Sequence, residues 1–217
     1  MRFRPADLAS IGLLACASIL TGVVVKRELG VRRGPPGVVK IKPRAEISLV
    51  GRRIGSAGAP SVVVFFGDFQ CPYCARAQAP LTRILTEYAE DVQLVYRHLP
   101  LETVHPHAWK AALASECAGD QGRFREYHDL LYQVQDSIGR IPWTHLAERA
   151  GVASVNEFET CVAEERQNQA IERDIILARS LGLNGTPAFV VGDELIHGLP
   201  PEGWLERRIA REVERRR

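Results

Sequence analysis

The residues most able to do chemistry are Cys71 and Cys74, which Pro72 and Tyr73 separate. The pair follows an apolar run at 62–66 and precedes a segment with helical periodicity, so the first cysteine should lie at a helix N-terminus. Unpaired N–H groups and the helix dipole stabilise negative charge there, and proline suits the first helical position. A thiolate in that setting has a lowered pKa. The pattern predicts thiol–disulfide exchange, with Cys71 as the nucleophile and Cys74 as the thiol that resolves the mixed disulfide.

Two other roles for the CxxC pattern remain open from the residues alone. It could form half of a zinc site with His105, His107 or other cysteines, although the sequence has no second CxxC, or it could form a purely structural disulfide. Disulfide exchange needs no metal ligand, so we interpret His98, His105 and His107 as structural and expect neither a metal ion nor a cofactor. Asp68 and Arg76 flank the pair, and could tune the thiol pKa or serve as a turn residue and a solvated helix residue.

A second candidate is the dipeptide Thr186-Pro187, which follows Gly185 and opens a predicted strand at 188–191. A proline at the start of a strand can be a simple turn residue. A cis peptide bond would instead be a specific feature of the site. It would place the backbone N–H and C=O of Thr186 against the catalytic sulfurs, ready to pair with an extended substrate segment.

Apolar runs of strand length predict one mixed sheet around these motifs. The expected strands are 46–50, 62–66, 92–96, 188–191 and 194–197. The last two strands flank Gly192-Asp193, which is typical of a hairpin turn. Because one strand–helix–strand unit is followed by further helices, a hairpin and a last helix, we expect an α/β fold with a mixed central sheet covered by helices.

Helical periodicity fills the rest of the folded part. The helix after the cysteines has the apolar stripe Ala77, Leu81, Ile84, Leu85 and Tyr88. Pro80 lies inside that helix and should kink it. From about residue 106 to 183 several helices are expected, and Ser154 with Glu157 forms a capping box that should open one long helix reaching Ala178. The final helix has the stripe Leu205, Ile209 and Val213.

The N-terminal segment differs in composition from the rest of the chain. Residues 1–45 hold nine Lys and Arg against two acidic residues, a net charge of +7, and the whole chain carries +2, which leaves −5 for the rest. Residues 8–25 are apolar or small, and at about 1.5 Å each they can cross the hydrocarbon core of a membrane. This basic charge lies beside an apolar segment, which favours a membrane surface over nucleic acid as the partner.

We predict that residues 1–25 form an uncleaved signal anchor and that residues 26–45 form a basic, Pro- and Gly-rich linker. A cleaved signal peptide and a lipoprotein signal at Ala15-Cys16 are the alternatives, but only a short apolar stretch precedes that position and more follows it. Four basic residues follow the apolar segment at 26–33 and two precede it, which favours a cytoplasmic domain. The predicted exchange chemistry favours the opposite orientation, and we follow the chemistry.

Three motifs taken together resemble the DsbA-like branch of the thioredoxin superfamily. They are DFQCPYC at 68–74, YRHLPL at 96–101 and GTPAFVVGDELIHG at 185–198. The resemblance covers about residues 46–215 and implies a thioredoxin fold with an inserted helical domain at about 104–183. It also implies a cis-proline at Pro187 facing Cys71. The Pro72-Tyr73 dipeptide is shared with glutaredoxins, but the helical insertion and the export segment exclude a plain glutaredoxin.

The same resemblance implies a membrane-anchored enzyme whose catalytic domain lies on the extracytoplasmic, periplasmic side. Its substrates would be cysteine-containing exported proteins, and a quinone-linked membrane protein of the DsbB-like or VKOR-like type would reoxidise it. We expect a disulfide-forming oxidase. The alternatives are a reductase or isomerase of the same fold, and a metal-binding module of the copper-chaperone type. The dipeptide between the cysteines differs from the histidine-containing one of the best-known DsbA proteins and tunes the redox potential.

Two further cysteines, Cys117 and Cys161, lie on separate predicted helices 44 residues apart. In a cytosolic protein they would be two buried free thiols. In an exported protein a disulfide between them is favoured, and some DsbA-like proteins carry a second bridge between these helices. Cys16 lies in the apolar N-terminal segment, where it serves as a small apolar residue.

Overall fold

The computed structural model describes residues 37–42, 47, 48 and 50–216. The predicted signal anchor and most of the predicted linker lie outside these residues. Contacts divide the chain into Met1–Pro36 and Gly37–Arg217, and every described residue belongs to the second unit. Among the helices of that described part, none has the length and apolar character needed to span a bilayer.

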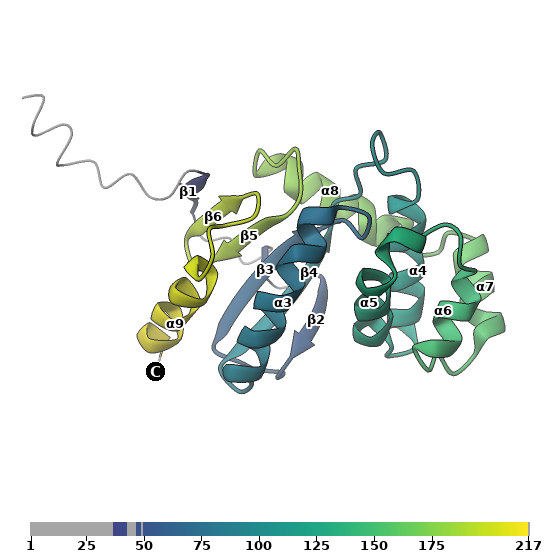
Figure 1. The fold of residues 1–217 in the computed structure, drawn as a ribbon, viewed down its shortest axis with the longest axis horizontal. Helices are drawn as coiled ribbons and strands as arrows, with labels where there is room; N and C mark the ends of the chain where they lie inside the picture. Colours follow the sequence, from purple (N-terminus) through teal and green to yellow (C-terminus); the bar gives the residue numbers. More distant parts are fainter. Residues whose placement is uncertain (1–36, 43–46, 49, 217) are drawn as a thin grey trace, which may run out of the picture. The chain divides into compact units, whose positions relative to one another are not determined.

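A six-stranded mixed sheet forms the centre of the described part, in the order β1-β6-β5-β3-β4-β2 (Figure 1). The strands are β1 (Val38–Lys40), β2 (Arg52–Gly55), β3 (Ser61–Gly67), β4 (Val92–His98), β5 (Ala188–Val191) and β6 (Glu194–His197). β3 and β4 pair in parallel, and the other pairings are antiparallel. Both central strands are almost fully buried, which explains their continuous apolar runs. The central strands and the C-terminal hairpin are therefore confirmed.

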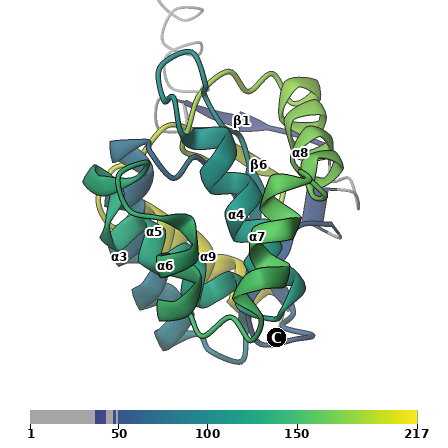
Figure 2. The ribbon, with the colours of Figure 1, turned by 90° about the vertical axis from the view of Figure 1, so that its right-hand side faces the viewer.

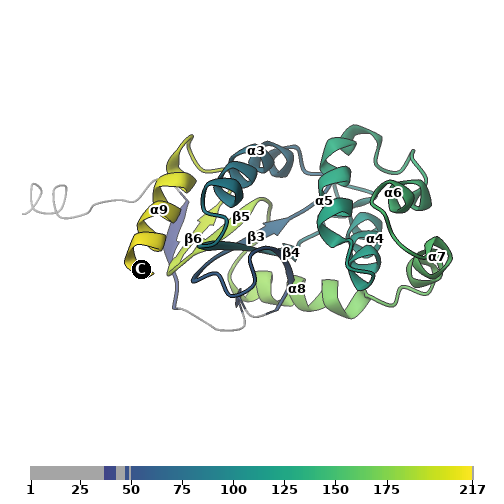
Figure 3. The same ribbon diagram turned by 90° about the horizontal axis from the view of Figure 1, so that it is seen from below.

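Helices cover both faces of the sheet. They are α3 (Pro72–Glu87), α4 (Ala108–Asp120), α5 (Phe124–Gln133), the short 3-10 helix η1 (Gln135–Ser137), α6 (Trp143–Arg149), α7 (Val155–Ala163), α8 (Asn168–Ser180) and α9 (Trp204–Arg216). α3 and α9 lie on one face, and α8 lies on the other (Figure 3). The expected stripes of α3 and α9 pack in one core with alternate residues of β3, such as Val63 and Phe65. Val64 and Phe66 face the opposite core with Ala178 of α8.

The helices between β4 and β5 form the predicted insertion. α4, α5, α6 and α7 are grouped beside the sheet, as Figure 2 shows from their side. A disulfide joins Cys117 of α4 to Cys161 of α7, with both side chains buried. The bridge favoured for an exported protein is therefore present, and it links two helices of the insertion.

Two edge strands differ from the sequence prediction. β1 lies inside the predicted linker, and Val38 pairs with Ile196 of β6, so the folded unit begins before residue 46. Of the predicted strand 46–50, the described residues Ile47 and Ser48 are helical, and the strand begins at Arg52. Both are outer strands of the sheet; β1 has no fully buried residue and β2 has one, so neither carries the apolar pattern of a central strand.

The long helix expected from residue 155 to 178 is two helices, so this prediction was wrong. Ser154 does cap the first of them, because its Oγ accepts a hydrogen bond from the backbone N–H of Glu157 at 3.2 Å. α7 then ends in a turn in which Glu165 has a left-handed φ of 52° and the N–H of Arg166 bonds to Cys161 O. This is a Schellman-type ending in which glutamate occupies the position that glycine usually takes. No glycine or proline marked the break in the sequence.

Candidate active site

The two cysteines lie where β3 passes into α3. Cys71 is the N-cap of α3, with Pro72 at the start of the helix, as predicted. Its backbone N–H bonds to Asp68 O at 3.1 Å, which closes the turn after the strand. Cys74 is one helical turn further on and is fully buried, whereas Tyr73 between them is 53% exposed. Both sulfurs are free thiols, so the geometry is that of the reduced pair.

The two thiols have very different acidities. A hydrogen bond from the Cys74 thiol, together with the backbone N–H groups of Tyr73 and Cys74, lowers the pKa of Cys71 to about 5, although Cys71 is buried and burial alone would raise it. Burial, and next the proximity of Cys71, raise the pKa of Cys74 well above its usual value. At neutral pH the pair therefore holds a thiolate on Cys71 and a thiol on Cys74. That is the charge distribution that exchange through Cys71 requires.

The cis peptide bond expected from the resemblance is present between Thr186 and Pro187. Cys71 Sγ lies 3.4 Å from the carbonyl oxygen of Thr186, although 115 residues separate them, and it can donate a hydrogen bond to that oxygen only when it is protonated. The N–H of Gly198 donates to Pro187 O at 2.8 Å and so ties the segment after β6 to the same loop. The fold thus brings the three motifs of the sequence prediction to one end of the sheet.

Asp68 is a buried turn residue and not a free charge beside the thiol. Its carboxylate accepts hydrogen bonds from the backbone N–H of Gln70 at 2.8 Å, from the N–H of Leu101 at 2.9 Å and from His105 Nδ1 at 2.8 Å. The N–H of His107 donates to the side chain of Gln70 at 2.6 Å. These bonds fasten the loop after β4 to the turn that carries Cys71.

His98 is also part of a structural network. It is buried, and its Nε2 lies 2.9 Å from Glu116 Oε1, while its backbone N–H donates to Asp174 at 2.9 Å. Arg97 forms a buried ion pair with the same aspartate at 2.6 Å. Within residues 37–42, 47, 48 and 50–216, no three His, Cys, Asp or Glu side chains gather closely enough to hold a metal ion.

Gln135 is a site residue that the sequence did not reveal. It belongs to η1 of the insertion, and its side-chain Nε2 donates to Phe69 O at 2.7 Å and to Cys71 O at 3.0 Å. Tyr132, from the same region, has its hydroxyl 3.0 Å from that of Tyr96 behind the cysteine turn. The insertion therefore contacts the backbone of the nucleophile directly. No local pattern predicts such contacts, because 64 residues separate Gln135 from Cys71.

A CxxC pair at a helix N-terminus, a cis-proline against its first sulfur, and helices inserted between β4 and β5 are the features of a thiol–disulfide oxidoreductase with a thioredoxin fold. Residues 48–209 match the protein-family model described as thioredoxin, and the chain belongs to that family.

Solved structures of related proteins share this architecture. A thioredoxin-like oxidoreductase from Silicibacter pomeroyi DSS-3 has 27% identity and a TM-score of 0.64, covering 75% of this chain and 92% of its own. A periplasmic thioredoxin-like protein from Salmonella enterica serovar Typhimurium has 28% identity and a TM-score of 0.60, covering 75% and 89%. Oxidised BdbD from Bacillus subtilis, at 21% identity, has a TM-score of 0.69 and covers 82% and 98%, which is a likeness of fold.

This chain also matches part of several curated proteins that are much longer than it is. The Na(+)/H(+) antiporter NhaA 1 of Salinispora arenicola (strain CNS-205) is 40% identical over 144 residues, which are 66% of this chain and 22% of the antiporter. NhaA 1 of Mycolicibacterium gilvum (strain PYR-GCK) is 32% identical over 198 residues, 88% of this chain and 32% of its own. The chain thus spans about a fifth to a third of these relatives, and antiport is named for them alone.

Proposed function

We propose that this protein is a disulfide-forming oxidase of exported proteins. Cys71 forms the mixed disulfide with the client, and its thiolate is the nucleophile when the reduced enzyme is reoxidised. The observation that carries the proposal is the Cys71 thiol, whose pKa is lowered to about 5 at the start of α3. A thiolate stabilised in this way stabilises the reduced enzyme, and an enzyme with a stable reduced form is a strong oxidant. The same thiolate is a good leaving group when the mixed disulfide is resolved.

The catalytic steps follow from the two acidities. A client thiolate attacks Cys71 Sγ of the oxidised pair, and the bond between Cys71 and Cys74 breaks. Cys74 leaves as a thiolate and takes up a proton, because burial raises its pKa. A second client thiolate then attacks the client sulfur and displaces Cys71 as a stable thiolate. The client loses two electrons and its two thiol protons and gains one disulfide. The enzyme is left with a thiolate on Cys71 and a thiol on Cys74, so one proton stays on Cys74 and the other goes to solvent.

Client binding in this proposal uses the loop around the cis peptide bond. An extended client segment pairs with the backbone of Thr186, whose carbonyl lies 3.4 Å from Cys71 Sγ. Pro187 keeps that edge accessible, and the exposed Pro72 and Tyr73 contact the client on the other side of the sulfur. A quinone-linked membrane protein of the DsbB-like or VKOR-like type accepts the two electrons and restores the disulfide. The proposed location is the extracytoplasmic side of the cell membrane, with residues 1–25 as the anchor.

The test is the reduction potential of the Cys71/Cys74 pair, equilibrated against glutathione buffers in the full-length protein. We expect a value closer to that of DsbA, about −120 mV, than to that of thioredoxin, about −270 mV. A potential near the thioredoxin value would contradict the oxidase and favour a reductase of the same fold. Metal that binds stoichiometrically, survives dialysis and is lost in Cys71→Ser would favour a metal-binding module instead.

A further inference from the structure

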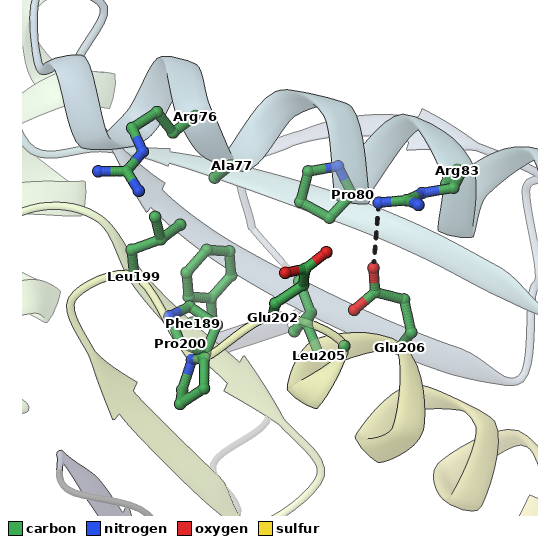
Figure 4. Close-up of a pocket in the computed structure, with 12 residues that line it drawn as sticks. Arg76, Ala77, Pro80, Arg83, Phe189, Leu199, Pro200, Glu202, Leu205 and Glu206 are labelled. Atoms are coloured by element: carbon green, nitrogen blue, oxygen red, sulfur yellow. Dashed lines mark hydrogen bonds and ion pairs between the residues drawn. The ribbon is translucent and has the colours of Figure 1, made fainter.

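A groove runs along α3, and Arg76, two residues after Cys74 in the sequence, is the first residue of the helix that lines it (Figure 4). It has a volume of about 290 Å³, and its apolar lining is Ala77, Pro80, Phe189, Leu199, Pro200, Pro201 and Leu205. One wall is α3, whose N-cap is Cys71. The other wall is the segment after β6, which the hydrogen bond from Gly198 to Pro187 holds against the cis-proline loop. A client bound at the cis-proline loop therefore has this groove next to it.

The charged residues of the groove are arranged in order along it. Arg76 lies at the end nearest the start of α3, Glu202 lies farther along, and Arg83 pairs with Glu206 at 3.5 Å across the far end (Figure 4). Within the part of the chain that the structure describes, Arg76 forms no ion pair. Its guanidinium lies over the ring of Tyr73, 5.7 Å from the ring centroid. The cation is thus positioned by stacking, and its planar donors are free for a carboxylate.

We infer that Arg76 makes the enzyme select client cysteines that have an acidic residue close to them in sequence. Arg76 is five residues beyond Cys71, a rise of about 7.5 Å along the helix. Two residues of an extended client cover about 7 Å, so a client that runs along α3 from Cys71 places the second residue from its reactive cysteine beside Arg76. A carboxylate there can bind the guanidinium through two parallel hydrogen bonds. Glu202 repels a client carboxylate placed farther along the groove. This inference rests on the proposed oxidase function and names its substrate class.

The test uses reduced dithiol peptides in which the second residue on either side of each cysteine is Asp in one peptide and Asn in the other. The rate constant for reduction of the oxidised full-length protein is measured by acid quench and mass spectrometry. Each rate is divided by the rate of the same peptide with neutral hydroxyethyl disulfide, which removes the effect of Asp on the peptide thiol. We expect a normalised Asp-to-Asn ratio of about two- to fivefold, the range of an exposed ion pair. High salt should reduce the ratio towards one.

Variants of Arg76, compared with a control variant outside the groove, test whether the preference for Asp depends on this residue. Arg76→Gln should bring the Asp-to-Asn ratio to about one, and Arg76→Lys should keep part of it. Arg149→Gln removes the same charge from an exposed position of α6 outside the groove and should keep the whole ratio. A ratio of one in the unaltered protein, or an equal loss in Arg149→Gln, would overturn the inference while leaving the oxidase intact. If neither peptide gains a disulfide, the oxidase itself is contradicted, and the inference falls with it.

Discussion

The charge of one sulfur atom controls the chemistry of this site. We expect the 240 nm absorbance of the reduced protein to show Cys71 ionising with a midpoint near pH 5. Because a hydrogen bond from Cys74 is the main cause of the lowered pKa, Cys74→Ala should move that midpoint upward. Cys71→Ser should abolish the transition, since Cys74 stays protonated at neutral pH. A midpoint near 8.5, the value of an unperturbed thiol, would contradict this account.

The same shift makes the stability of the reduced protein depend on pH. The pKa of Cys71 is lower in the folded state than in the unfolded state, so its thiolate contributes to the free energy of unfolding above the unfolded value of about 8.5. That contribution decreases as pH falls and is lost once pH passes below about 5. The oxidised protein has no such thiolate. Stability therefore falls more steeply between these pH values in the reduced form than in the oxidised form.

Gln135 offers a second single-residue test, because its amide holds the carbonyls of Phe69 and Cys71. Gln135→Ala should lower the free energy of unfolding by about 1–3 kcal/mol, the usual range for two neutral hydrogen bonds. It should also shift the reduction potential, because the turn carrying the nucleophile loses its support. Gln133→Ala, at an exposed position two residues earlier, is the matched control for denaturation and for potential measurements. An unchanged potential in Gln135→Ala would show that the contact only stabilises the fold.

The chemistry of the site was predictable where local sequence determines it, and not where distant elements meet. Cys71 and Pro72 sit at a strand-to-helix junction, so the sequence alone predicted a helix N-terminus with a lowered thiol pKa. The residues around Pro187 were compatible with a simple turn and with a cis peptide bond, and only the family resemblance favoured the cis bond that the structure shows. Gln135 and the groove depend on packing between segments far apart in the chain, which residue periodicity does not encode.

The disulfide between α4 and α7 should act on stability and not on exchange. It closes a loop of 44 residues, which on a chain-entropy model corresponds to about 4 kcal/mol. We expect the double variant Cys117→Ala/Cys161→Ala to have a lower thermal midpoint and a lower free energy of unfolding. Its Cys71/Cys74 potential should match that of the unaltered protein. A large change in that potential would show that the bridge also shapes the site through the insertion.

The apolar pattern of the sequence predicts the central strands of the sheet but not its edge strands. β3 and β4 are buried on both faces and were predicted within two residues at each end. β1 and β2 are outer strands with mostly accessible side chains, so neither shows an apolar run. β2 depends on Gly51, whose φ is 112° and where a Cβ would lie 2.7 Å from Tyr96 O. The close approach of the two strands becomes visible only once the sheet is assembled.

The basic residues that flank the apolar N-terminal segment and the chemistry of the folded part predict opposite orientations of the protein in the membrane. Four basic residues at 26–33 follow the apolar segment and favour a cytoplasmic domain, whereas a structural disulfide between Cys117 and Cys161 is typical of an oxidising compartment. Structural disulfides are rare in cytosolic proteins, because glutathione and thioredoxin keep cysteines reduced there. The bridge therefore adds support, independent of the catalytic pair, for the proposed extracytoplasmic location.

Topology can be tested on the complete chain with two reporters fused after Arg217. We expect alkaline phosphatase, which needs an oxidising compartment, to be active there, and a reporter that works only in the cytoplasm to be inactive. The protein should sediment with membranes and keep its N-terminal residues, and Leu13→Arg/Leu14→Arg should release it, because two charges at the centre of an apolar span cost several kcal/mol. Activity of the cytoplasmic reporter alone would overturn the export proposal. Mass spectrometry of the mature chain distinguishes retention of residues 1–25 from cleavage or lipidation at Cys16.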